Sequence, residues 1–408
     1  MLRTLLTLAI ALVASAVHAA DWPQFLGPNR DNVSSEKVEA WTGEPKVAWR
    51  HALGFAHSSP VVANGVVYAF FQPKGQDADA LAAYDAKTGT EKWVKSYTRE
   101  AFAPPFGKGP RSTPVVADGR VFTLGGTGIL ACWDAKTGDV KWKVDTLKAF
   151  DAKNLFFGIS MSPIVEGNTV VAMVGGKGAG LVGFDVEKGT VTWKVTDDAA
   201  SYASPVAHGK GEQREIVFLT GSHLRAISLA GKERWAVPFK DGLNESSTSP
   251  VIVGDLVIGS SVTAGSIAVR RIADGEAVST KKVWEKKALT CYFSTPVVVG
   301  KFAYMVNGAA TLLNASITLR CVEIETGKVQ WEKTKVGRYH AAIIRTANDK
   351  LLMLDDNGHL ILFEPSEKEY KELCRSKVCG PTWSHPALVD GRLFLRDENE
   401  LLAIDLPK

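Results

Sequence analysis

The chain has 408 residues, of which 45% are hydrophobic and 23% charged, an ordinary globular balance. Its net charge of +4 is small and dispersed, which argues against nucleic acid as a partner. With 37 glycines and 18 prolines the sequence is rich in turn residues, as a fold of many short strands requires.

Residues 1–19 are predicted to be a secretory signal peptide. Arg3 is the basic start, residues 5–13 are the apolar run, and residues 17–19 (V-H-A) fit a small-residue cleavage site. We place the cut after residue 19, with residue 20 as the alternative. The apolar run is too short to cross a bilayer, and no Cys precedes Cys132, so lipid attachment at the cleavage site is not expected. We expect the protein to be periplasmic or secreted. We expect it to have no transmembrane segment and not to be a lipoprotein.

Residues 20–45 contain no repeat. Trp22 and Phe25 alternate with turn residues, which predicts an irregular N-terminal arm anchored on the body by its aromatic side chains. Residues 46–51 (K-V-A-W-R-H) then look like the last strand of a repeat that has no beginning.

One eleven-residue pattern organises the rest of the chain. It reads A-Y-D-A-K-T-G-T-E-K-W at residues 83–93 and returns at residues 132–142, 183–193 and 321–331. The acid can bond the backbone of the turn, and the glycine supplies the positive φ of a short hairpin. Those glycines are Gly89, Gly138, Gly189 and Gly327. Four near-complete copies indicate a repeat protein.

The tryptophan that ends the pattern is the candidate contact between neighbouring sheets. The small residue at the first position leaves room in which we expect a Trp of a neighbouring repeat to lie, each ring burying about 200 Å². The alternative is an ordinary core aromatic, but the fixed offset from the glycine favours docking. The seven positions are Trp49, Trp93, Trp142, Trp193, Trp235, Trp284 and Trp331. Cys374 stands at the equivalent place in the seventh repeat, and Arg271 at the acid position of the fifth.

Each repeat opens with a small hydroxyl residue or an equivalent, then Pro, then an apolar strand. Eight such openings recur at intervals of 42 to 54 residues, which leaves room for four short strands per unit. Units of this kind are propeller blades. The last unit lacks its outer strand, which the segment around Trp49 would supply. The sequence therefore predicts an all-β, eight-bladed β-propeller over residues 46–408, closed by an N-terminal strand.

The motif resembles the docking motif of pyrroloquinoline-quinone (PQQ) repeats, and the resemblance covers residues 46–408. It implies a propeller of the superfamily that includes both quinoprotein dehydrogenases and the non-catalytic, partner-binding BamB. The alcohol-oxidising members carry adjacent cysteines, often C-x-x-C-H for haem, and a Ca²⁺ held by Glu, Asn and Asp. This chain has neither cysteine motif, and Asn244-Glu245 is the one Asn-Glu pair in a predicted inner loop.

Cys374 and Cys379 could form a local disulfide if a bend brings them together.

Residues before the inner strands are the candidates for function, because these loops meet at the channel mouth. His57, His340 and His385 come from consecutive blades and together could bind Zn²⁺ or Cu²⁺, although unequal offsets favour ordinary loop histidines. The candidate binding residues at the mouth are His57, Arg111, Tyr202, Glu245, Tyr292, Arg338, His340 and Trp383, with Phe293 and Tyr339 in the same loops. Aromatic and Arg side chains favour binding hot spots, while the alternative is that they only fill the channel.

These features predict a monomeric, non-catalytic binding or scaffold module for a protein or for a small-molecule or saccharide ligand. No cofactor is expected. The alternative function is a PQQ- and Ca²⁺-dependent dehydrogenase, or another enzyme with its site at the mouth.

Overall fold

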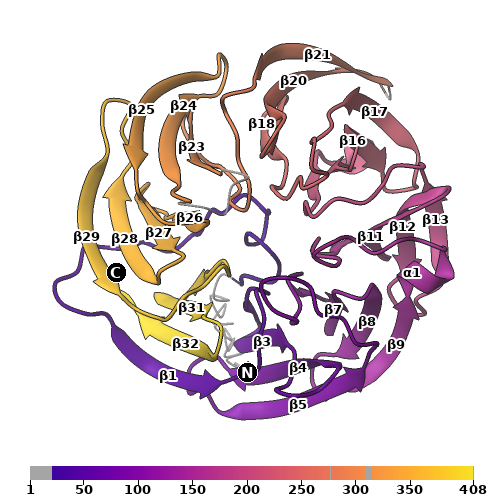
Figure 1. Ribbon diagram of the computed structural model, residues 1–408, viewed down its shortest axis with the longest axis horizontal. Coiled ribbons are helices and arrows are strands. Elements are labelled where there is room, and N and C mark those ends of the chain that lie inside the picture. Colours follow the sequence, from indigo (N-terminus) through magenta and orange to yellow (C-terminus); the bar gives the residue numbers. More distant parts are fainter. Residues whose placement is uncertain (1–20, 276, 309–314, 408) are drawn as a thin grey trace, which may run out of the picture.

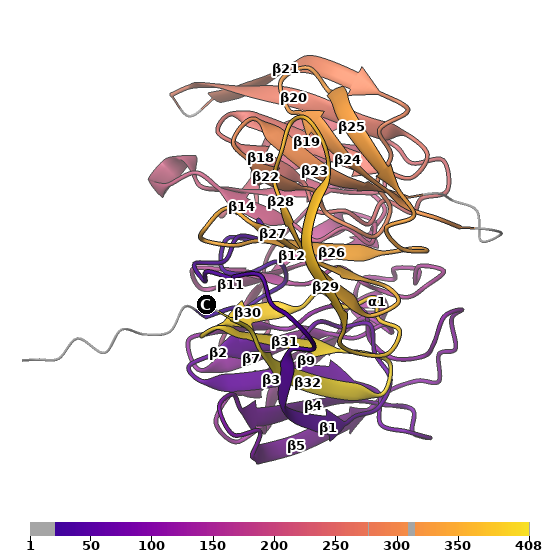
Figure 2. The same ribbon diagram turned by 90° about the vertical axis from the view of Figure 1, so that its left-hand side faces the viewer.

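The computed structural model describes residues 21–275, 277–308 and 315–407. Within them, eight four-stranded antiparallel sheets surround a central axis, each sheet forming one blade (Figure 1). Seen from the side, the blades make a thick disc (Figure 2). The prediction of an eight-bladed propeller is confirmed. The predicted signal peptide lies outside the described residues. No helix in the described part of the chain is long and apolar enough to cross a membrane.

The first four blades follow one another along the chain. Blade 1 contains β2 (Val61–Ala63), β3 (Val66–Phe71), β4 (Ala78–Asp85) and β5 (Glu91–Thr98). Blade 2 contains β6 (Val115–Ala117), β7 (Arg120–Leu124), β8 (Ile129–Asp134) and β9 (Val140–Asp145), and the short helix α1 (Thr146–Ala149) follows it. Blade 3 contains β10 (Ile164–Glu166), β11 (Thr169–Gly176), β12 (Ala179–Asp185) and β13 (Val191–Val195). Blade 4 contains β14 (Val206–His208), the 3-10 turn η1 (Gly211–Gln213), β15 (Glu215–Leu219), β16 (His223–Ser228) and β17 (Glu233–Pro238).

The second half of the ring repeats this plan. Blade 5 contains β18 (Val251–Val253), β19 (Leu256–Ser261), β20 (Gly265–Asp274) and β21 (Ala277–Lys286). Blade 6 contains β22 (Val297–Val299), β23 (Phe302–Asn307), β24 (Thr318–Glu323) and β25 (Lys328–Thr334). Blade 7 contains β26 (Ala341–Arg345), β27 (Leu351–Asp355), β28 (His359–Glu364) and β29 (Lys371–Lys377). Blade 8 contains β30 (Ala387–Val389), β31 (Arg392–Arg396) and β32 (Glu400–Asp405), and its outer strand is β1 (Lys46–Ala52).

The two ends of the described propeller share blade 8. Strand β1 runs antiparallel to β32, with Lys46 opposite Asp405 and Ala52 opposite Glu400 (Figure 1). The predicted closure of the ring by the segment around Trp49 is therefore confirmed. Because this pairing occupies the outer edge of β32, it removes a sheet edge that could otherwise pair with another chain.

The repeated motif forms a hairpin held by its own acid. Asp85 Oδ1 accepts hydrogen bonds from the backbone N–H groups of Lys87 (3.1 Å) and Thr88 (2.9 Å). Gly89 then adopts φ = 74°, a conformation that glycine reaches without steric cost. On the returning strand, Trp93 lies directly opposite Ala83.

The indole of each motif tryptophan packs on the next blade. The Nε1–H of Trp93 donates to the carbonyl of Ala135 in blade 2 (3.3 Å), and a Cβ on Gly138 of that blade would lie only 2.5 Å from the ring. The same pairing of indole with glycine joins Trp49 to Gly89, Trp142 to Gly189, Trp193 to Gly231 and Trp284 to Gly327. This corrects one detail of the expectation. The small first residue faces the Trp of its own blade, because the two are cross-strand partners, and the glycine of the next blade receives the ring.

Blade 4 departs from this scheme. The Nε1–H of Trp235 donates to the buried carboxylate of Glu215 (3.2 Å), which also forms an ion pair with Arg271 of blade 5 (2.6 Å). In the motif, the acid lies two residues after the residue that pairs with the Trp. In blade 5, Ala268 pairs with Trp284, so Arg270 holds the acid position. The prediction that Arg271 holds it was wrong by one residue.

Blade 7 lacks its own motif tryptophan and uses one from the N-terminal arm. Trp41 is buried against this blade. Its backbone N–H donates a hydrogen bond to Cys374 Sγ (3.5 Å), and its Nε1–H donates one to Ser376 Oγ (2.9 Å). The disulfide considered between Cys374 and Cys379 is not formed, and both are free thiols. Cys374 lies in β29, and Cys379 follows two residues beyond the end of that strand.

Candidate functional site

Small hydroxyl residues at the blade openings link the inner strands around the axis. Ser59 N–H donates to Thr113 Oγ1 (3.1 Å), Thr113 N–H to Ser162 Oγ (2.9 Å), and Ser162 N–H to Ser204 Oγ (2.9 Å). His385 N–H donates to Ser59 Oγ (2.9 Å), which carries the chain of bonds across the closure. The hydroxyl-Pro openings therefore fix the positions of neighbouring inner strands and of the loops that precede them.

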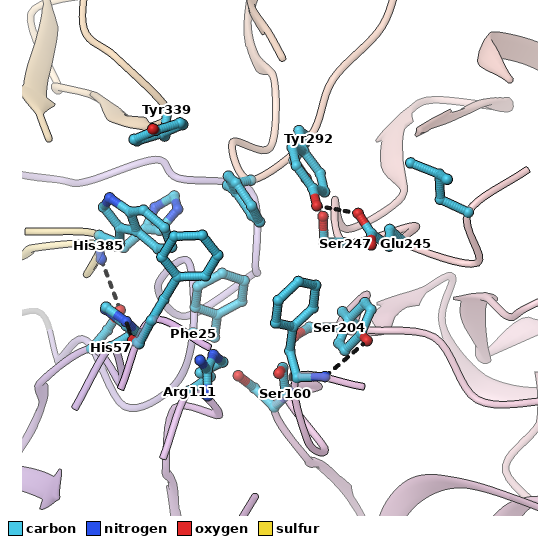
Figure 3. Close-up of a pocket in the computed structure, with 18 residues that line it drawn as sticks. Phe25, His57, Arg111, Ser160, Ser204, Glu245, Ser247, Tyr292, Tyr339 and His385 are labelled. Carbon is cyan, nitrogen blue, oxygen red and sulfur yellow. Dashed lines mark hydrogen bonds between the residues drawn. The ribbon is translucent and has the colours of Figure 1, made fainter. Parts of the chain in front are cut away.

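A cavity of about 230 Å³ lies at this end of the channel (Figure 3). Loops from every blade meet there, because each loop leads into an inner strand. The lining residues are Phe25, His57, Ser59, Phe106, Arg111, Phe157, Ser160, Ser162, Tyr202, Ser204, Leu243, Glu245, Ser247, Tyr292, Phe293, Tyr339, Trp383 and His385.

Aromatic rings form much of the wall, and Trp383 is central among them. Its ring stacks with those of His57 (centroids 5.0 Å apart) and Phe293 (5.3 Å), and Tyr339 meets it edge-on (5.7 Å). Phe293 stacks in turn on Tyr292 (3.7 Å). Rings that support one another in this way hold a preformed apolar surface, as ligand sites usually require.

The N-terminal arm supplies the floor. Phe25 lines the cavity and meets the ring of His385 edge-on (5.1 Å). The arm itself contacts the inner strands, where the N–H of Val116 in β6 donates to the carbonyl of Pro23 (2.8 Å). Buried Arg30 secures it with hydrogen bonds to the carbonyls of Ser162 (3.2 Å) and Pro205 (3.0 Å). The channel is thus occupied by the arm at one end and open to the cavity at the other.

Arg111 is the cation of the lining. One guanidinium nitrogen donates to the carbonyls of Pro105 (2.7 Å) and Gly107 (3.3 Å), and no carboxylate in the described ranges pairs with it. Burial lowers the pKa of Arg111 to about 10, although the neighbouring Tyr202 hydroxyl opposes this effect. Arg111 is half-buried, and the cost of partly removing its charge from water is therefore not offset by an ion pair.

Glu245 is the carboxylate of the lining. Its Oε2 accepts a hydrogen bond from the Tyr292 hydroxyl. Burial first and Glu245 second raise the pKa of Tyr292 well above its usual range, so the phenol remains protonated and keeps donating. In Figure 3 this pair and Arg111 lie on different sides of the cavity.

The three candidate histidines do not form one cluster. His57 Nε2 lies 2.8 Å from the carbonyl of Phe106, while the rings of His340 and His385 meet with centroids 5.0 Å apart. Burial, followed by repulsion from Arg111, lowers the pKa of His57 to about 3. Burial also lowers the pKa of His340 to about 4 and that of His385 well below its usual value. No group of three or more His, Cys, Asp or Glu in the described residues is arranged to hold a metal ion.

Most of the candidate mouth residues line the cavity: His57, Arg111, Tyr202, Glu245, Tyr292 and Trp383. His340 and Arg338 do not. His340 is buried beneath, with Nδ1 3.2 Å from Ser294 Oγ, whereas Arg338 is exposed and lies over the Tyr339 ring (4.8 Å). Strand offsets alone could not separate residues that face the axis from those that lie behind it.

Sequence reasoning missed several lining residues. Phe106 and Phe157 come from the loops before blades 2 and 3, where the intervals between openings are the longest, 54 and 49 residues. Those long intervals indicate long loops before these two blades, and they were the sequence signal that could have pointed to Phe106 and Phe157. The lining serines lie in or beside the hydroxyl-Pro openings, which the sequence shows. No sequence pattern indicated that Phe25 and Leu243 line the cavity.

The lining residues do not fit a PQQ–Ca²⁺ pair. PQQ is a flat tricarboxylate, and Arg111 is the one Lys or Arg among the lining residues that the structure describes. Ca²⁺ needs several oxygen ligands, yet Glu245 is the one carboxylate in the same set and already accepts the bond from Tyr292. The quinone chemistry that the repeat resemblance implied therefore has no matching set of side chains in the described cavity.

Comparison with known families places the chain by sequence. The family model described as "Outer membrane protein assembly factor BamB" matches residues 77–331. A search of curated proteins finds no match.

Solved structures resemble the chain in fold. BamB from Moraxella catarrhalis aligns with a TM-score of 0.60 at 13% identity, covering 89% of this chain and 98% of its own. A europium-containing methanol dehydrogenase gives 0.62 at 11% identity, covering 95% and 98%. The quinohemoprotein alcohol dehydrogenase from Comamonas testosteroni gives 0.61 at 12% identity, covering 95% and 82%. At such identities the likeness concerns the fold alone, which BamB and two dehydrogenases share.

Proposed function

The chain belongs to the family described as outer membrane protein assembly factor BamB, and from this we propose that it is an exported, non-catalytic binding module. Its ligand or partner enters the cavity at the channel mouth. The cavity carries the proposal, because a preformed apolar site with a few placed polar groups is the form that binding sites take.

The rim of the cavity supports contact with a partner. Phe156 is 70% exposed, Leu243 49% and Phe106 41%, and all three belong to mouth loops. Phe106 and Leu243 also line the cavity. Large exposed apolar residues around a pocket are typical of interaction surfaces.

The polar groups of the cavity support binding over catalysis. His57 Nε2 is engaged by a backbone carbonyl, and Glu245 by the Tyr292 hydroxyl. A general base must instead reach the proton that it abstracts. The alternative function, a PQQ-dependent dehydrogenase, has the fold of its relatives in its favour and the composition of the cavity against it.

Recovery of the protein from its own periplasm tests the proposal. Tagged wild type, Trp383→Ala and Ile272→Ala are purified under mild conditions, and co-purifying proteins and small molecules are identified. Ile272 is a control, because it is 47% exposed on β20 and does not line the cavity. We expect a partner or ligand retained by wild type and Ile272→Ala and lost from Trp383→Ala. Dye-linked alcohol oxidation after incubation with PQQ and Ca²⁺ would contradict the proposal.

A further inference from the structure

Building on the proposed binding function, we propose that the mouth cavity takes a small, flat, apolar carboxylate that also carries a hydrogen-bond donor at its far end. The carboxylate binds Arg111, the ring lies among the aromatic walls, and the donor reaches Glu245.

The charge preference follows from Arg111. Its guanidinium lines the cavity, has no carboxylate partner in the described chain, and spends one nitrogen on two loop carbonyls. The N–H groups on Nε and Nη1 remain, and each can donate a charge-assisted hydrogen bond to a carboxylate oxygen. A ligand carboxylate would supply the counter-charge that this half-buried guanidinium lacks.

The shape preference follows from the walls and the volume. Trp383, Phe293 and Tyr292 support one another face to face, which favours a planar apolar body beside them. A cavity of about 230 Å³ lies below the range of pockets for drug-sized ligands, which begins at roughly 300 Å³. A single ring with about ten non-hydrogen atoms is the appropriate size.

The second polar end follows from Glu245. Tyr292 occupies Oε2, and no described residue donates a hydrogen bond to Oε1. That oxygen can accept from a ligand hydroxyl. Because the Glu245–Tyr292 pair and Arg111 lie on different sides of the cavity, the ligand's donor and carboxylate must be at opposite ends (Figure 3).

Binding of 4-hydroxybenzoate to the mature chain, measured by isothermal titration calorimetry, tests this inference. Its neutral isostere 4-hydroxybenzamide lacks the negative charge and so tests the role of Arg111. Benzoate lacks the hydroxyl group and so tests the role of Glu245. We expect the acid to bind at least tenfold more tightly than the amide, because hydrogen bonds to a charged group are the stronger kind. Benzoate should bind about fivefold more weakly than 4-hydroxybenzoate.

Two arginine variants assign the effect to its residue. Arg111→Met should reduce the affinity for the acid to that for the amide, whereas Arg50→Met, which removes an exposed arginine of β1 outside the lining, should leave both affinities unchanged. Thermal unfolding of both variants checks that the fold is kept. Equal binding of acid and amide by wild type would overturn the inference and leave the binding function standing. Absence of binding by all three compounds would also overturn it, while the co-purification experiment judges the binding function separately.

Discussion

At the scale of single residues, the glycine of each motif has two roles. It provides the positive φ of the hairpin, and it leaves a flat surface on which the indole of the preceding blade rests. The first role could be predicted from one repeat alone. The second could not, because it depends on the position of the next blade, and the small residue at the head of the motif was the more obvious receiver.

Gly189→Ala separates these two roles. Gly189 has φ = 67° and its Cβ would lie 2.6 Å from the Trp142 ring, whereas Gly167 has φ = 57° with nothing within 4 Å. Both alanine variants carry the backbone strain, but only Gly189→Ala displaces an indole. We expect Gly189→Ala to reduce the free energy of unfolding by about 1–3 kcal/mol more than Gly167→Ala, measured by denaturant titration. Equal losses would show that the indole contact contributes little.

The buried histidines predict a loss of stability in mild acid. In the unfolded chain, His340 and His385 titrate near pH 6.5. Burial lowers the pKa of folded His340 to about 4, and that of His385 well below its usual value. Between pH 6.5 and 4 the unfolded state therefore binds protons that the folded state does not. Stability is fully present above pH 6.5 and falls toward pH 4, by roughly 3 kcal/mol for His340 alone.

Denaturant titrations at pH 7 and pH 4.5 measure that loss. The double variant His340→Asn/His385→Asn should lose less stability than wild type over this interval, because its side chains do not titrate there. An identical fall in both proteins would assign the acid sensitivity to other groups, such as carboxylates.

At the scale of elements, the blades and the arm differ in how far sequence could describe them. Blades were predictable, because the hydroxyl-Pro opening and the Asp–Gly–Trp hairpin recur. The arm has no repeat, so its path across the channel and the use of Trp41 by blade 7 left no mark in the sequence. The same holds for Phe25, whose contact with His385 depends on that path.

Arg30→Ala should release the arm. Its guanidinium bonds the carbonyls of Ser162 and Pro205 inside the propeller, and removing it leaves buried acceptors without donors. We expect trypsin to cut the variant at Lys37 several-fold faster than wild type, as followed by mass spectrometry. Arg50→Ala, which removes a solvent-exposed arginine of β1, is the control and should be cut like wild type. Unchanged cleavage of Arg30→Ala would mean that other contacts hold the arm.

At the scale of the whole molecule, the number of blades and the closure of the ring were predictable, because both follow from counting openings and finding an orphan strand. The composition of the cavity was only partly predictable. Arg338 and Tyr339 are adjacent in sequence, yet only Tyr339 lines the cavity. The turn of a loop decides which neighbour faces the axis, and the repeats do not encode that turn.

Removal of residues 21–52 should open the ring. Without β1, the outer edge of β32 has unpaired backbone groups that can pair with another chain. We expect self-association by size-exclusion chromatography and a lower unfolding temperature. A second truncation that removes residues 21–45 but keeps β1 controls for loss of the arm and should stay closer to wild type. A monomer with wild-type unfolding temperature after the longer truncation would show that closure is dispensable.

The pairing of β1 with β32 also sets an order of events during synthesis. The strand made first finds its partner in residues 400–405, which are made almost last, so β1 stays unpaired while the other blades are translated. Contacts so distant along the chain form slowly. Completion of the eighth blade is therefore a late step of maturation, and a chain interrupted before residue 400 leaves its first strand without a partner.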